Sequence, residues 1–152
     1  MYEVEYKNYI TRNDVRGSNN IFVFGDNDRR SGYGGQAKEM RGEPNAVGVR
    51  VKKSPSMDSN AFYTDDEYTE NVRKINEDLL RLGMMANGKK IIFPSNGIGT
   101  GMARLNITAP MTFKYLTDVL RTSFNITNGN VIRFRKITKI IRKKSIKKCK
   151  CK

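Results

Sequence analysis

Two short apolar segments each run directly into a glycine-rich loop, and this pairing limits the folds open to the chain. Ile21-Phe22-Val23-Phe24 continues into Gly25-Asp26-Asn27, and residues 90–93 continue into a loop with glycine at 97, 99 and 101. Segments that are apolar on both faces are typical of strands buried inside a parallel sheet. Since the carboxyl ends of parallel strands meet at one edge, we expect the two loops to lie together. The pattern predicts an α/β fold.

Alternating apolar residues predict further strands over residues 2–6 and 46–51. Residues 131–134 predict an additional edge strand. The polar stretch over residues 7–20 is expected to form a loop.

Apolar residues at helical spacing predict two long helices, over residues 64–83 and 108–122, and a short one over residues 36–41. For the first long helix we expect Thr64 or Asp65 as the N-cap, because short polar side chains accept hydrogen bonds from the first free N–H groups. Gly83 is expected to end that helix.

The two loops have the composition of an anion-binding site. Glycine lets backbone N–H groups approach an anion closely, and a following helix N-terminus adds partial positive charge. The alternative is that the glycines only form turns. Two such loops after neighbouring strands favour a nucleotide site. The expected ligand-binding residues are Gly25, Gly34, Gly35, Gln36, Ser95, Asn96, Gly97, Ile98, Gly99, Thr100 and Gly101.

The charge of the chain is concentrated at one end. The chain holds 29 Lys and Arg against 15 Asp and Glu, and eleven of the basic residues but no acidic one lie in residues 131–152. We therefore expect a nucleotide-binding domain over residues 1–130 and a basic tail over residues 131–152. Such a tail can bind DNA, RNA or an anionic membrane surface, or remain a solvated terminus without a partner. The candidate nucleic-acid-binding residues are Arg142, Lys143, Lys144, Lys147 and Lys148.

Histidine is absent from the chain. Its absence excludes Ser-His-Asp and Cys-His nucleophile systems and the commonest general base at neutral pH. Because the loops also contain no clustered carboxylates, we expect neither a metal nor a cofactor. Any chemistry must use carboxylate, amide, lysine and water.

The expected location is the cytoplasm. We expect no transmembrane segment, because no apolar run approaches the length that crosses a bilayer. The N-terminus lacks the pattern of a signal peptide. Cys149 and Cys151 are too close for an unstrained disulfide, so we expect exposed reduced thiols.

Three motifs carry a resemblance to a known family: Val23-Phe24-Gly25-Asp26-Asn27, Arg41-Gly42-Glu43-Pro44-Asn45-Ala46-Val47-Gly48 and Gly97-Ile98-Gly99-Thr100-Gly101-Met102-Ala103. Together with the order of elements, they resemble the macrodomain superfamily of ADP-ribose-binding modules. The narrower similarity is to small macrodomain-like proteins of bacteria and tailed bacteriophages, and it covers about residues 20–123. The resemblance implies a three-layer α/β/α macrodomain-like fold with a mixed sheet. For a phage protein it implies the host cytoplasm.

The resemblance also implies roles for individual residues. The glycines of both loops would surround the pyrophosphate of ADP-ribose, and Asn27 would orient the distal ribose. Asp14 is the candidate for the aspartate that recognises adenine. One hydrolytic branch uses a lysine, and Lys52 follows the strand where such a lysine would lie; the alternative is a plain surface lysine.

The expected function is therefore binding of an ADP-ribose-type nucleotide and hydrolysis of ADP-ribose from a modified protein or nucleic acid, or processing of a free derivative. The candidate catalytic residues are Asp26, Asn27 and Lys52. Asp26 would position or deprotonate water or bind a ribose hydroxyl, and Lys52 would stabilise negative charge or act as a nucleophile. Two alternatives remain open at this point: a non-catalytic ADP-ribose reader or sponge, and a nucleic-acid-binding protein that acts through its tail.

Overall fold

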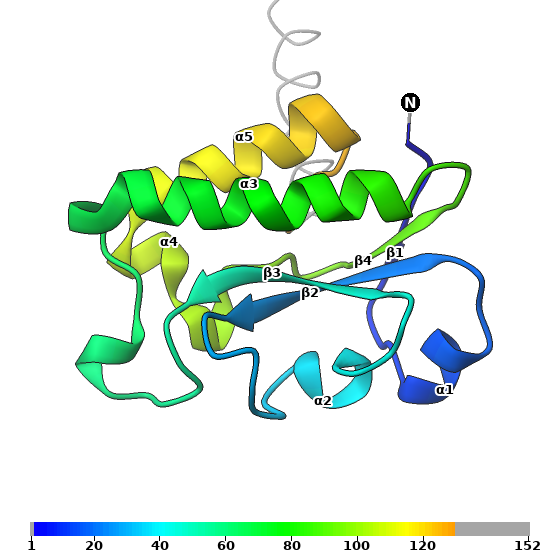
Figure 1. Ribbon diagram of the computed structural model, residues 1–152, viewed down its shortest axis with the longest axis horizontal. Helices are drawn as coiled ribbons and strands as arrows, with labels where there is room; N and C mark the ends of the chain where they lie inside the picture. The colour runs from blue at the N-terminus through cyan, green and yellow to red at the C-terminus, as the bar shows by residue number, and fades with distance from the viewer. Residues whose placement is uncertain (1, 130–152) are drawn as a thin grey trace, which may run out of the picture.

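The computed structural model describes residues 2–129 as a four-stranded sheet covered by helices on both faces (Figure 1). The elements follow one another as β1 (Val4–Lys7), α1 (Arg12–Arg16), β2 (Ile21–Asn27), α2 (Ala37–Met40), β3 (Ala46–Lys52), α3 (Tyr68–Met85), β4 (Ile91–Pro94), α4 (Leu105–Thr108) and α5 (Pro110–Phe124). The α/β class and its three layers are confirmed.

The spatial order of the strands is β1-β4-β2-β3, and all neighbouring pairs are parallel. Among the described residues, the antiparallel contribution is an isolated bridge between Lys52 and Phe62. The predicted strand over residues 131–134 lies outside the described residues, as does the whole basic tail with its candidate nucleic-acid-binding residues. No helix of the described part has the length and apolar character to cross a membrane.

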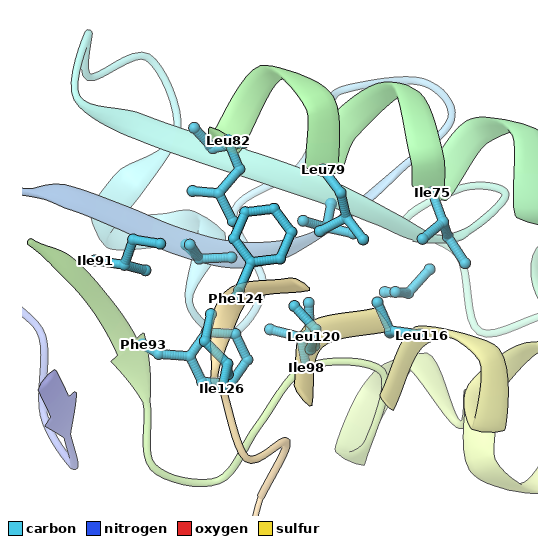
Figure 2. Close-up of a cluster of buried hydrophobic side chains, with 14 of the residues drawn as sticks. Ile75, Leu79, Leu82, Ile91, Phe93, Ile98, Leu116, Leu120, Phe124 and Ile126 are labelled. Carbon is cyan, nitrogen blue, oxygen red and sulfur yellow. The ribbon is translucent and has the colours of Figure 1, made fainter. Parts of the chain in front are cut away.

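Each inner strand feeds two separate cores, because successive side chains point to opposite faces. In β2, Ile21 and Val23 pack under α3 and α5, whereas Phe22 and Phe24 pack against α1 and α2. Figure 2 shows the larger core, in which α3 and α5 meet over β4. This double burial explains why the segment is apolar on both faces.

Three predictions about the elements were wrong, two of them at residues that make tertiary contacts and one at a local helix cap. Asp65 does not cap its own helix: a 3-10 helix (Asp65–Glu67) precedes α3, and the Asp65 carboxylate accepts hydrogen bonds from the backbone N–H groups of Met111 and Thr112 at the start of α5. Gly83 lies inside α3, where its carbonyl accepts a hydrogen bond from the Tyr2 hydroxyl. The predicted loop contains α1, whose N-cap Thr11 forms a capping box with Asp14.

Candidate functional site

The two glycine loops meet in one cleft at the carboxyl ends of β2, β3 and β4. Its volume is about 220 Å³. The first loop contributes Gly25, Asp26, Asn27, Gly34, Gly35 and Gln36, and the second contributes Gly97, Ile98, Gly99 and Thr100. The cleft is smaller than a typical site for a drug-sized ligand.

Most predicted ligand-binding residues line this cleft, but not all of them. Ser95, Asn96 and Gly101 do not line it. Asp14, the candidate for adenine recognition, also lies outside the lining, and its carboxylate accepts a hydrogen bond from the Thr11 backbone N–H. Sequence reasoning did not assign Ser31, Gly32, Arg41, Pro55, Met102 and Ala103 to the lining.

The second loop has a backbone path that favours glycine. Gly97, Gly99 and Gly101 have φ angles of 81°, 85° and 60°, in the left-handed region that L side chains rarely adopt. Gly99 is also crowded, because a Cβ there would lie 3.2 Å from Cδ2 of Leu105. Asn128 holds the loop: its Oδ1 accepts from the N–H of Ile98 and its Nδ2 donates to the carbonyl of Ile98.

Both loops present backbone N–H groups that have no acceptor in the described part of the chain. Within residues 2–129, the N–H groups of Gly34 and Gly35 and those of Gly99, Thr100 and Gly101 donate no hydrogen bond. Consecutive free N–H groups next to a residue with positive φ form a concave binding site for an anion. The two loops contact each other, since a Cβ on Gly34 would lie 3.2 Å from Cε of Met102.

Asp26 lies at the end of β2 and is 5% exposed. Its Oδ1 accepts from Nη2 of Arg41 at 2.6 Å and from the N–H of Asn27 at 2.8 Å, and its Oδ2 accepts from Nη1 of Arg30 at 3.0 Å. Both carboxylate oxygens are therefore engaged by guanidinium groups. This geometry suits a carboxylate that fixes the first loop.

Arg41 is the residue that joins Asp26 to the loop. Its Nε donates to the carbonyl of Gly32, and its Nη2 donates to that of Ser31 as well as to Asp26. The guanidinium stacks 5.6 Å from the ring centroid of Phe24 and lines the cleft. In the sequence, its place at the start of the Arg41-Gly42-Glu43-Pro44-Asn45 motif was the available signal.

Asn27 is 7% exposed and closes the turn that follows β2. Its Nδ2 donates to the carbonyl of Ser31 at 2.8 Å, and its Oδ1 accepts from the N–H of Arg29 at 3.0 Å. Both ends of the amide therefore hold the loop in shape.

Lys52 lies at the end of β3, beside Asn27 in the sheet register. It lines the cleft and is 6% exposed. Its Nζ lies 3.4 Å from Sδ of Met57 and 4.8 Å from the ring centroid of Phe62. No carboxylate of residues 2–129 forms an ion pair with it. Burial lowers the pKa of the Lys52 ammonium, and the charge of Arg104 lowers it further.

Comparison with known proteins places this site within a family. The model of a family of unknown function (DUF7831) matches residues 5–119. The chain belongs to this family. The match to DUF7831 includes both glycine loops, Arg41 and Lys52 and ends before the basic tail. No curated protein and no solved structure matches the chain.

Proposed function

We propose that the protein binds an ADP-ribose-type nucleotide in this cleft and hydrolyses ADP-ribose from a modified protein or nucleic acid. The observation that carries the proposal is the convergence of two loops, more than 60 residues apart in the sequence, on one cleft. Its lining includes four residues whose N–H groups are free among residues 2–129: Gly34, Gly35, Gly99 and Thr100. A pyrophosphate is the anion of matching chemistry, since several backbone donors can each bind one of its oxygens.

Lys52 is the group that favours hydrolysis over simple binding. Lys52 lies in the cleft lining, and its ammonium has no carboxylate partner among residues 2–129, so it can stabilise negative charge that develops on the leaving group. In the proposed step, water attacks the anomeric carbon of the distal ribose. The bond to the acceptor breaks with its electron pair, and the acceptor gains a proton in place of the one that the water loses.

Asp26 and Asn27 have a supporting role in this proposal. Because their polar atoms already hold the first loop, they position its N–H groups around the pyrophosphate and set the place of the ribose. Catalysis by Asp26 as a base would require it to release Arg30 or Arg41 first.

A pair of glycine substitutions tests the binding site. Gly35 and Gly88 both have positive φ (56° and 72°), and a Cβ at either position would meet nothing within 4 Å. Asparagine tolerates this backbone region, so Gly35→Asn and Gly88→Asn should both fold. Gly35 lines the cleft and Gly88 does not. Calorimetry with ADP-ribose should show at least about tenfold weaker binding for Gly35→Asn and wild-type binding for Gly88→Asn. Equal affinity for all three proteins would contradict the proposal.

A second experiment distinguishes a hydrolase from a protein that binds ADP-ribose without cleaving it. Wild type and Lys52→Met are incubated in single-turnover conditions with ADP-ribosylated DNA and with ADP-ribosylated protein, and released ADP-ribose is measured by mass spectrometry. Wild type should release ADP-ribose from one substrate, whereas Lys52→Met should bind that substrate and release little. If wild type binds ADP-ribose but releases none from either, the protein is a reader.

A further inference from the structure

Two cations share one aromatic ring beside the cleft. Nζ of Lys52 lies 4.8 Å and Cζ of Arg104 lies 5.7 Å from the ring centroid of Phe62. The ring is 6% exposed. The isolated bridge between Lys52 and Phe62 fixes the ring relative to β3. Both cations are therefore held by a buried part of the fold.

Arg104 reaches this ring from the second glycine loop. It follows a 3-10 helix (Gly101–Ala103), and its backbone N–H donates to the carbonyl of Gly101. Its own carbonyl accepts from the N–H groups of Ile107 and Thr108 in α4. The residue itself is exposed, and the two residues before it, Met102 and Ala103, line the cleft. Arg104 thus follows the cleft-lining residues of the second loop directly, and its guanidinium lies over the same ring as the ammonium of Lys52, which lines the cleft.

The two charges have no counter-ion among the residues that the structure describes. Within residues 2–129, neither Lys52 nor Arg104 forms an ion pair, and the Arg104 guanidinium donates no hydrogen bond. By contrast, the other cation in the cleft lining, Arg41, is paired with Asp26. Like charges close together in a partly buried place are unfavourable, and an anion between them removes that cost. The lowered pKa of Lys52 agrees with this uncompensated charge.

We propose that Lys52 and Arg104 form a second anion-binding point, separate from the free N–H groups of the glycine loops, which takes a phosphate group. Lys52 binds it as a point charge, and Arg104 binds it through paired N–H donors. The natural ligand then carries a phosphate in addition to the pyrophosphate held by the loops. This inference does not depend on ADP-ribose being the nucleotide.

Titration with inorganic phosphate tests this point directly, by calorimetry on wild type, Lys52→Met, Arg104→Gln and the matched control Arg81→Gln. Arg81 is an exposed arginine of α3 outside the cleft lining. Lys52→Met and Arg104→Gln should each bind phosphate about tenfold more weakly than wild type, because each removes a charge-assisted contact. Arg81→Gln should bind within about twofold of wild type. Thermal unfolding of each variant confirms that it is folded.

A competition arm separates the two anion points and the two proposals. Phosphate should still bind wild type that is saturated with ADP-ribose, and Arg104→Gln should abolish this remaining binding. Arg104-dependent phosphate binding in a protein that does not bind ADP-ribose would overturn the proposed function and leave the second point in place. Equal phosphate affinity for Arg104→Gln and Arg81→Gln would overturn the second point. Complete displacement of phosphate by ADP-ribose would also overturn the second anion-binding point.

Discussion

Two buried charged residues lie at the ends of adjacent strands and line the cleft, and they differ in ion pairing. Asp26 at the end of β2 is 5% exposed, and Lys52 at the end of β3 is 6% exposed. Asp26 receives two guanidinium groups and a backbone N–H. The Lys52 ammonium instead contacts the sulfur of Met57 and the aromatic ring of Phe62. The difference indicates that the carboxylate serves the fold. Since an unpaired buried charge is unfavourable, the state of the ammonium agrees with the proposal that Lys52 binds an anion.

The partners of Asp26 extend well beyond the cleft. Arg30 also forms an ion pair with Asp78, which is buried in α3 and accepts hydrogen bonds from the N–H and Nε of Arg50 in β3. The first loop, the sheet and α3 are thus tied by one network. Lys52 has no such connection among residues 2–129, so a change at Lys52 should affect ligands more than stability.

The largest expected effect is that of Asp26→Asn. The change leaves Arg41 without its carboxylate and Arg30 with that of Asp78 alone, and breaking a partly buried ion pair should lower the free energy of unfolding by about 3 kcal/mol. Urea unfolding measures it, with Asp66→Asn, an exposed aspartate, as the control. Unfolding midpoints that are equal for the two variants would show that Asp26 is not a structural group.

Gly48→Ala tests the same carboxylate from the neighbouring strand. A Cβ on Gly48 would lie 2.5 Å from Oδ2 and 2.8 Å from Cβ of Asp26. Because Asp26 is fixed by its partners, the clash should lower the free energy of unfolding by about 2 kcal/mol. The control is Gly17→Ala, an exposed glycine with φ of −82°, which should change stability little. Unchanged stability of Gly48→Ala would mean that the Asp26 side chain can move.

Lys52→Met should stabilise the protein, whereas the two preceding substitutions should destabilise it. Methionine has a similar length and carries no charge to bury, so the free energy of unfolding should rise by about 1 kcal/mol after the loss of the cation–π contact with Phe62. Thermal and urea unfolding at neutral pH measure the change. A clear destabilisation would show that the protein itself compensates the ammonium, and the contrast with Asp26 would be lost.

The smallest expected effect is the pH dependence of the stability difference between Lys52→Met and wild type. The native pKa of Lys52 is lowered by burial, so between the native and the unfolded pKa the unfolded chain binds more protons and stability rises with pH. The cost of the charge is complete below the native pKa and decreases as the pH rises from the native pKa to the unfolded pKa. The stability advantage of Lys52→Met should therefore shrink from neutral pH toward pH 10. A constant difference would indicate an unshifted pKa.

Local patterns in the sequence were sufficient for the fold class and for the meeting of the two glycine loops. The apolar run of β2 and the glycines at 34–35 and 97–101 predicted buried parallel strands whose loops lie together, and residues of both loops line one cleft. These features are encoded locally, because the residue period reports which faces are buried and glycine reports where the backbone needs positive φ. For the same reason the cap of α1 was present in the sequence as Thr11 and Asp14, although it was missed.

Partnerships between distant residues required the tertiary structure. Asp65 and Gly83 have the residue types of a helix cap and a helix end, yet their contacts with α5 and Tyr2 override these local preferences. Likewise, no periodicity indicates that Arg41 neutralises Asp26 while Lys52 receives only Met57 and Phe62. The sequence by itself determined which charged residues end the strands. Only the packing of loops and helices decided which of these charges is compensated, because burial and ion pairing depend on residues brought together by folding.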